Sequence, residues 1–248
     1  MRFFAALQFL TTIPVFRRRE FKPEDLGRSA GYFPIVGLVI GLLLAGLSWL
    51  FLLFLPPAIA TALLIVALVI ITGALHLDGF VDICDGIGGQ KTAEDRWRVM
   101  HDSRAGGFGI IGIVLLLLVK YVSLGSIPEP SLMAALVLMP VLSRWAMVYS
   151  IFAYSYALPA GLGKSFKQGT NWLRFTMATT IALVLAVALF QLIGLALIFL
   201  TWVVTVIAAA YFKDKFSGLT GDTYGAINEL AEVSVLIFIV IFAQFGLA

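Results

Sequence analysis

The stretch that decides the fold is residues 58–89, AIATALLIVALVIITGALHL followed directly by DGFVDICDGIGG. Its first part, residues 58–77, is almost entirely apolar, and about 20 apolar residues are what a helix needs to cross the roughly 30 Å hydrocarbon core of a membrane. Three aspartates, Asp78, Asp82 and Asp85, come immediately after this run. The stretch therefore predicts a membrane span that leads straight into an acidic segment.

Composition supports a membrane location for the whole chain. Of 248 residues, 61% are hydrophobic and 12% are charged, whereas soluble domains are about 45–50% apolar and about 25% charged. Such an excess of apolar side chains needs lipid as its solvent. The single cysteine, Cys84, excludes an internal disulfide and fits a reducing compartment. The modest formal charge of +3 gives no sign of a nucleic-acid partner.

The pattern predicts an all-α fold: a polytopic membrane bundle of about seven transmembrane helices plus an N-terminal interfacial helix. We expect a single domain over residues 1–248, because no linker or internal repeat divides the chain. The sequence is also compatible with a homo-oligomer. The candidate spans are 33–55, 58–77, 108–125, 131–152, 175–193, 195–211 and 233–247.

Basic residues indicate which side of the membrane the polar segments occupy. All but two of the 17 Lys and Arg residues lie in four segments that alternate placement puts on one side, namely 1–32, 78–107, 153–174 and 212–232. By the positive-inside rule this side is the cytoplasm. We therefore expect a multi-pass protein of the cell inner membrane, with active-site segments 78–107 and 212–232 facing the cytoplasm.

The two remaining basic residues lie inside spans. Lys120 is toward the outer end of its span, where a long side chain can extend to the interface. Arg144 is toward the cytoplasmic end of its span, where a charge is costly and usually faces a partner or a cavity. We interpret Arg144 as a group that pairs with an aspartate or binds a substrate phosphate.

Residues 1–16 are too short to span a membrane. Phe3, Phe4, Leu7 and Leu10 recur at helical spacing, which predicts a helix lying in the interface in contact with membrane lipid. Whether this helix is only an anchor or also takes part in the site stays open.

The acidic run predicts a metal site. On a continuous helix, Asp82 lies about 40° and Asp85 about −20° from Asp78 around the axis, so the three carboxylates share one face. Carboxylates this close repel one another unless cations neutralise them, and hard oxygen ligands suit Mg²⁺. Asp78, Asp82 and Asp85 are therefore the predicted metal ligands. The plainer alternative is a solvated acidic helix end.

The segment that follows predicts phosphate binding. Arg104 precedes the glycine-rich start of the next span, where free backbone N–H groups can bind an anion. Arg96 could act in the same way or simply mark the cytoplasmic side. His101 is a candidate for substrate binding or proton transfer, with a hydrogen-bonded structural role as the alternative. His76 projects away from the three aspartates on the same helix and has the same two interpretations.

A second acidic group lies before the last span. Glu229 and Glu232 are three residues apart and Asp222 is seven before Glu229, so a helix would gather them on one broad face. With Asp82, Asp222 and Glu229 are candidates for catalytic work as metal ligand or base. The alternative is a helix cap, in which Asp222 or Thr223 begins the final helix.

Carboxylates with a bound cation and a nearby arginine favour phosphoryl transfer. The cation neutralises a diphosphate, and a carboxylate accepts the proton of an attacking hydroxyl. The residues alone thus predict a metal-dependent transferase that acts on a nucleotide-diphosphate-linked substrate at the membrane surface.

Several motifs resemble the cobalamin synthase family, the adenosylcobinamide-GDP ribazoletransferases. They run through nearly the whole chain in order and comprise LQFLTTIPV at 7–15, GYFPIVG at 31–37, the acidic run at 77–89, MHDSRAGGFG at 100–109, Ser143-Arg144 and GDTYGA at 221–226. The resemblance implies Mg²⁺-dependent transfer of the adenosylcobinamide phosphate from adenosylcobinamide-GDP to α-ribazole or its 5′-phosphate. GMP leaves, and adenosylcobalamin or its 5′-phosphate forms.

Other functions fit parts of the pattern. A CDP-alcohol phosphotransferase also places spaced aspartates in a membrane helix, but its usual Asp-Gly followed by Ala-Arg is not matched here. A polyprenyl transferase with aspartate-rich loops is a weaker option. A divalent-cation transporter would need acidic residues near the middle of the membrane, whereas the aspartates here follow the end of a span.

Overall fold

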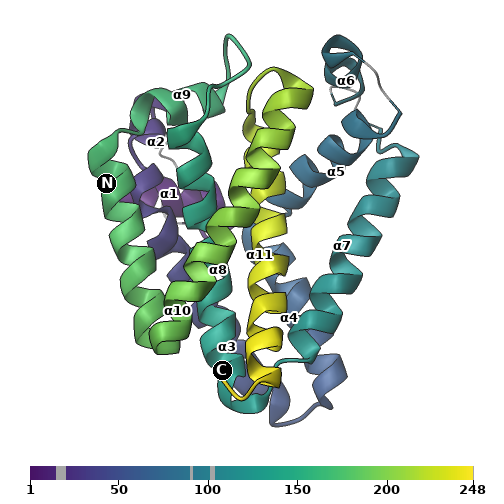
Figure 1. The fold of residues 1–248 in the computed structure, drawn as a ribbon, viewed down its shortest axis with the longest axis vertical. Coiled ribbons are helices and arrows are strands. Elements are labelled where there is room, and N and C mark those ends of the chain that lie inside the picture. Colours follow the sequence, from purple (N-terminus) through teal and green to yellow (C-terminus); the bar gives the residue numbers. More distant parts are fainter. Residues whose placement is uncertain (15–20, 90–91, 101–103, 248) are drawn as a thin grey trace.

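The chain forms an all-helical bundle in a computed structural model that describes residues 1–14, 21–89, 92–100 and 104–247. Long helices run side by side, and the short helices α2, α6 and α9 gather at one end (Figure 1). The predicted all-α membrane architecture is confirmed. In chain order the elements are α1 (Arg2–Leu10), α2 (Pro23–Gly27), a 3₁₀ turn (Ala30–Tyr32), α3 (Phe33–Leu52), α4 (Pro57–Thr72), α5 (Leu75–Ile87), α6 (Ala93–Met100), α7 (Gly107–Gly125), α8 (Glu129–Ala153), α9 (Leu162–Gly169), α10 (Trp172–Phe216) and α11 (Gly221–Gln244).

Within the described residues, five helices are long and apolar enough to cross a membrane, and α4 with α5 make a sixth if this bent pair counts as one span. Helix α10 is broken at Gln191, whose φ of 51° and ψ of −129° are not helical. Its two halves run in opposite directions (Figure 1). Gly194 permits the reversal, because a Cβ there would overlap the backbone of Ala186. Each predicted span thus corresponds to a helix or to one half of α10.

The second predicted span does not run straight into the acidic segment. Helix α4 ends at Thr72, Gly73 and Ala74 take left-handed φ angles of 62° and 57°, and α5 leaves at 93° to α4. The expectation of a continuous span to Leu77 is therefore wrong. The acidic residues are helical as predicted, but their helix is turned relative to the one before it.

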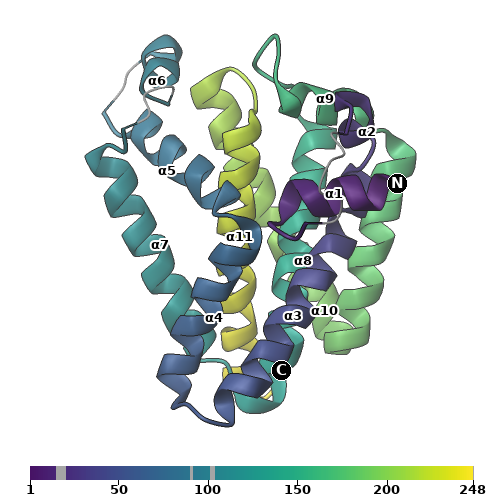
Figure 2. The ribbon, with the colours of Figure 1, turned by 180° about the vertical axis from the view of Figure 1, so that it is seen from behind.

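The N-terminal helix is built into the bundle. Figure 2 shows α1 lying crosswise to the long helices, and Ala5, Ala6 and Leu10 on it are fully buried. Just after α1, the N–H of Thr12 donates to the carbonyl oxygen of Ile71 at 2.7 Å. The Thr12 hydroxyl donates to the carbonyl oxygen of Ile70 at 2.9 Å. Carbonyls at a helix end lack intrahelical partners, so these bonds stabilise the bend after α4. The helix is more than a surface anchor.

The last helix begins earlier than expected. Residues 221–232, predicted to precede a span at 233–247, form the first half of α11. Thr220 is its N-cap: the Thr223 N–H donates to the Thr220 hydroxyl at 3.3 Å, and the Thr220 N–H donates to the Thr223 hydroxyl at 2.7 Å. Such a reciprocal pair satisfies two of the free N–H groups at a helix start. The helix start is capped, as the alternative interpretation expected, but the N-cap is Thr220 and not the predicted Asp222 or Thr223.

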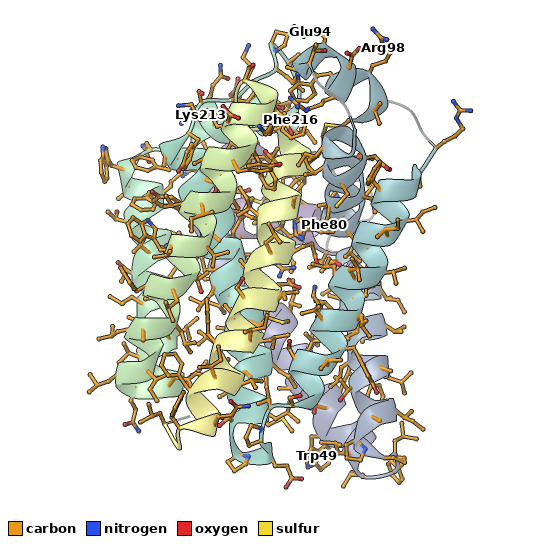
Figure 3. The ribbon with its side chains drawn as sticks, turned by 45° about the vertical axis from the view of Figure 1, so that its right-hand side comes forward. Trp49, Phe80, Glu94, Arg98, Lys213 and Phe216 are labelled. Carbon is orange, nitrogen blue, oxygen red and sulfur yellow. The ribbon has the colours of Figure 1, made fainter. Side chains whose placement is uncertain are left out.

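Charged side chains differ between the two ends of the bundle. Figure 3 places Glu94, Arg98 and Lys213 at one end and Trp49 at the other. The charged end carries α6 and the C-terminal end of α10, which pack together through an edge-to-face contact of Trp97 and Phe216 with ring centroids 5.5 Å apart.

Candidate active site

Two glycines allow α5 and α11 to cross in close contact. A Cβ at Gly79 would lie 2.8 Å from the Asp222 Cα, and a Cβ at Gly225 would lie 3.2 Å from the His76 Cα. At such separations a side chain would push the helices apart, so glycine is required for the approach. The crossing brings the first turns of α5, with Asp78, beside the first turn of α11, with Asp222.

A cleft with a volume of about 330 Å³ lies at this crossing, and we call it the acidic cleft. Its size is at the lower end of the range of small-molecule sites, about 300–1,000 Å³. It joins one carboxylate from each of the two predicted acidic groups, Asp78 and Asp222. Its polar lining is His76, Asp78, Tyr156, Thr220, Asp222 and Tyr224, and its aromatic hydrocarbon lining is Phe9, Phe33 and Phe166.

The loop after α8 places Tyr156 at the cleft. The Ala157 N–H donates to the Leu219 carbonyl at 2.8 Å, and the Leu219 N–H donates to the Ser155 carbonyl at 2.9 Å. These bonds fix the loop beside the start of α11, where the rings of Tyr156 and Tyr224 stack with centroids 6.4 Å apart. Burial, and then the nearby Asp222 carboxylate, raise the pKa of Tyr156. Its hydroxyl therefore keeps its proton and can donate a hydrogen bond.

Three phenylalanines from separate elements form an aromatic wall of the cleft. The ring of Phe9 on α1 lies 4.8 Å from Phe166 on α9 and 6.3 Å from Phe33 on α3, and Phe33 lies 5.4 Å from Phe166. Sequence reasoning did not find these residues, or Tyr156, as site residues. Their contacts link elements far apart in the chain, and no spacing rule joins them; the motifs at 7–15 and 31–37 were the available signal for Phe9 and Phe33.

His76 lines the same cleft as Asp78, although helical spacing placed it on the opposite side of α5. Helix α5 begins at Leu75, so His76 and Asp78 both belong to its first turn. Both sides of this first turn line the cleft. The His76 side chain is buried, at 3% exposure, and neither ring nitrogen has a hydrogen-bond partner among the residues that the structure describes.

The other two aspartates of α5 are in different surroundings. Asp82 lies one helical turn after Asp78 and is half-buried. Asp85 is buried, and its carboxylate accepts the N–H groups of Gly106 at 2.7 Å and Gly109 at 2.8 Å. The expectation that these N–H groups are free to bind a phosphate is wrong, because Asp85 already binds them. The positive end of the α7 helix dipole also stabilises a carboxylate at this position.

The three aspartates therefore do not form one compact cluster. Across the ranges that the structure describes, no three His, Cys, Asp or Glu side chains come close enough together to hold a metal ion. The donor chemistry of the acidic cleft nevertheless suits Mg²⁺, which commonly binds one or two carboxylates and takes its other ligands from substrate phosphates and water. Asp78 in the cleft lining and Asp82, one helical turn further along α5, provide two such carboxylates.

The predicted phosphate-binding residues lie outside the lining of the acidic cleft. Arg96 on α6 donates to the Lys215 carbonyl at 2.9 Å and so ties α6 to the end of α10. Arg104 is exposed, just before α7. His101 lies outside the described residues. Their substrate-binding roles stay predictions.

Glu229 and Arg144 belong to a buried ion network between α7, α8 and α11. Lys120 donates to Glu229 at 2.6 Å and to Glu232 at 2.7 Å, and Arg144 also donates to Glu232. All four residues are at most 5% exposed. The expectation that Lys120 extends to the interface is wrong, because the two glutamates hold it inside the bundle. Neither Glu229 nor Arg144 lines the acidic cleft, and their predicted catalytic and substrate-binding roles stay predictions.

Together the fold and the site define a class: a polytopic helical membrane protein with an acidic, small-molecule-sized cleft near the end of the bundle where α9 lies (Figure 1). Within that class the chain belongs to the cobalamin-5-phosphate synthase family, which it matches over residues 2–240.

Similar proteins carry one common description. The chain is 39% identical over 241 residues to the adenosylcobinamide-GDP ribazoletransferase of Geotalea daltonii, with 96% of each chain covered. It is 37% identical over 231 residues to the protein of that description from Roseiflexus sp., covering 93% of this chain and 86% of the relative. With that of Shewanella frigidimarina the identity is 38% over 242 residues, covering 93% and 90%. No solved structure matches the chain.

Proposed function

We propose that this chain is an adenosylcobinamide-GDP ribazoletransferase, which performs the last step in assembling the nucleotide loop of cobalamin. The observation that carries the proposal is the meeting of Asp78 and Asp222 in one cleft of nucleoside size, in a chain that belongs to the cobalamin-5-phosphate synthase family. The substrates are adenosylcobinamide-GDP and α-ribazole or its 5′-phosphate.

The reaction is a phosphoryl transfer. A ribose hydroxyl oxygen of the acceptor forms a new bond to the cobinamide-linked phosphorus, the bond from this phosphorus to the GMP oxygen breaks, and GMP leaves. We assign Asp222 as the acceptor of the hydroxyl proton, because it lines the cleft from α11, on a different helix from Asp78. The raised pKa of Tyr156 leaves a neutral hydroxyl donor beside Asp222.

Asp78 and Asp82, one turn apart on α5, would hold Mg²⁺ together with the diphosphate. When bound, Mg²⁺ supplies neutralisation of the phosphate charge that develops in the transition state. If Asp85 also bound the metal, its carboxylate oxygens would do so while accepting hydrogen bonds from two backbone N–H groups. Arg104 and Arg96 would attract the diphosphate from the rim.

The charged end of the bundle is assigned to the cytoplasm of the cell inner membrane. Basic residues concentrate in the segments at this end, and the positive-inside rule orients short loops accordingly. A cytoplasmic cleft has direct access to nucleotide-activated substrates.

A transfer assay tests the proposed function. Purified protein in lipid nanodiscs is incubated with adenosylcobinamide-GDP and labelled α-ribazole, with Mg²⁺ or with EDTA. We expect labelled cobamide and GMP in equal amounts with Mg²⁺, and neither product with EDTA. Turnover of a CDP-linked alcohol substrate with release of CMP would instead assign the chain to the CDP-alcohol phosphotransferases.

Replacing the proposed base tests its role. Asp222→Asn is expected to lower kcat by about 10²- to 10⁴-fold, because the amide cannot accept the proton, while substrate binding persists. Asp214→Asn, an exposed residue at the end of α10 that pairs with Lys215 at 3.1 Å, is the matched control and should act as the unchanged protein does. Full activity of Asp222→Asn, or of Asp82→Ala in the same assay, would contradict the residue assignments.

A further inference from the structure

The acidic cleft has two chemically different ends. One end carries the carboxylates Asp78 and Asp222, and the other is walled by Phe9, Phe33 and Phe166. The proposed phosphoryl transfer uses only the first end. The aromatic end, with rings 4.8–6.3 Å apart, is built from three separate elements and has no role in the reaction as described so far.

Two residues of the cleft lining carry buried polar atoms without hydrogen-bond partners. The Tyr224 hydroxyl has no hydrogen-bond partner among the described residues, and the same holds for both ring nitrogens of His76. Each side chain is 3% exposed and lines the cleft. A buried polar group left without a hydrogen bond destabilises the protein, so these groups indicate a ligand that brings polar atoms to them.

We propose that the aromatic end of the acidic cleft is the binding site for the base of the acceptor nucleoside, α-ribazole, with the Tyr224 hydroxyl donating to the free ring nitrogen of the base and His76 binding a ribose hydroxyl. This inference rests on the proposed function and names the substrate that occupies one end of its cleft. The planar dimethylbenzimidazole stacks on the phenylalanine wall, and the ribose then extends toward Asp222.

The chemistry of the wall favours this base over the guanine of the other substrate. Dimethylbenzimidazole carries two methyl groups and a single free ring nitrogen. Guanine carries several donors and acceptors, and a wall of Phe9, Phe33 and Phe166 would leave most of them unsatisfied, which weakens binding. Aromatic stacking on the wall contributes to the binding of either base. The number of polar groups on each base therefore favours dimethylbenzimidazole over guanine at this wall.

Cleft size agrees with this assignment. A volume of about 330 Å³ accommodates a nucleoside, whereas the corrin ring with its side chains is several times larger and has to remain outside. The guanosine diphosphate and the corrinoid therefore approach from the carboxylate end.

Direct binding measurements test the assignment without relying on turnover. α-Ribazole and GMP are each titrated calorimetrically into nanodisc-embedded protein. Tyr224→Phe removes only the hydroxyl and is expected to weaken α-ribazole binding about 2- to 10-fold, the effect of one hydrogen bond. Phe166→Leu removes one ring of the wall and is expected to weaken it by a similar factor. GMP binding should be unchanged in both.

Tyr211→Phe is the matched control, because Tyr211 is 44% exposed on α10 and does not line the acidic cleft. It should bind α-ribazole as the unchanged protein does. The same variants are assayed for transfer, where KM for α-ribazole should rise and KM for adenosylcobinamide-GDP should stay constant. Circular dichroism and size-exclusion chromatography check folding, and if Tyr224→Phe misfolds, Phe166→Leu carries the test.

The outcomes separate the two proposals. If the unchanged protein forms cobamide and both folded variants bind α-ribazole normally, the base-binding site is overturned and the proposed function stands. If the variants weaken GMP instead, the aromatic end belongs to guanine and the inference is overturned as well. If the unchanged protein forms no cobamide and releases no GMP, both proposals fail.

Discussion

Gly79 has a large effect on the site for a residue without a side chain. It lies between Asp78 and the phenylalanine at position 80, where α5 crosses the first turn of α11, and its missing Cβ leaves room for the Asp222 backbone. The chemistry of Asp78 and Asp222 thus depends on a neighbour that cannot take part in it. The same logic applies to Gly225, which accommodates the His76 backbone.

A substitution at Gly79 should therefore separate the carboxylates. Gly79→Ala places a Cβ 2.8 Å from the Asp222 Cα, and we expect a loss of activity of about 10²-fold, the effect of a displacement near 1 Å in an active site. Overpacking should also lower the free energy of unfolding by about 1–3 kcal/mol. The transfer assay and denaturant unfolding measure the two effects.

Gly46→Ala is the matched control, because a Cβ at Gly46 on α3 meets no atom within 4 Å. It should keep full activity, and the protein should be no less stable, since alanine favours a helix more than glycine does. Equal behaviour of the two variants would contradict the close crossing of α5 and α11.

Among the residues, the sequence singled out Asp78 and Asp222, which the structure places in one cleft, because charged residues next to apolar runs are conspicuous. The surroundings of Lys120 were not predictable. A lysine near a span end usually extends to the interface, and only the positions of Glu229 and Glu232 on a neighbouring helix reverse that preference.

At the scale of elements, the buried ion network links α7, α8 and α11. Lys120 and Arg144 face Glu229 and Glu232, so two positive and two negative groups offset one another away from water. The pairs fix the helix whose first turn carries Asp222. Glu229 thus lies in the ion network on α11 and does not line the cleft.

Removing one member of the network should be costly. Lys120→Met leaves Glu229 buried without its cation, and we expect the free energy of unfolding to fall by about 3–5 kcal/mol. The double variant Lys120→Met with Glu229→Gln should lose less than Lys120→Met alone, because the uncompensated charge is gone. Unfolding in mixed micelles measures both.

Lys213→Met provides the comparison, because Lys213 lies at the exposed charged end of the bundle (Figure 3). A surface change of this kind should stay within about 0.5 kcal/mol. A double variant that is destabilised as much as the sum of its single changes would contradict a direct Lys120–Glu229 pair.

Helix positions followed from hydropathy, and even the break in α10 at Gln191 lies close to the predicted boundary between the spans 175–193 and 195–211. The 93° bend after α4 did not. A glycine inside an apolar run is compatible with a straight helix or a turn, and here the bend depends on Ala74 joining Gly73 in a left-handed conformation and on Thr12 binding the freed carbonyls. These contacts come from distant parts of the chain.

At the scale of the whole molecule, the position of the acidic cleft predicts the orientation of the protein. The cleft lies near the end that carries α9 (Figure 1), and basic segments concentrate there. The positive-inside rule places such segments in the cytoplasm. The link between α7 and α8, residues 126–128, should therefore face the side of the membrane away from the cytoplasm.

Cysteine labelling tests this orientation. With Cys84→Ser as background, Asp214→Cys at the end of α10 should react with a membrane-impermeant maleimide only in inside-out vesicles. Glu129→Cys at the start of α8 should react only in right-side-out vesicles. Both positions are exposed. The reverse pattern would contradict a cytoplasmic cleft.

The central claim is that Asp78 and Asp222 act in one site, and the most direct test is a double-mutant cycle on the single-turnover rate of cobamide formation. Groups that act as a unit show non-additive losses. We predict that Asp78→Asn with Asp222→Asn is slower than the more impaired single variant by less than about 10-fold. A double variant whose loss equals the product of the two single losses would contradict the claim.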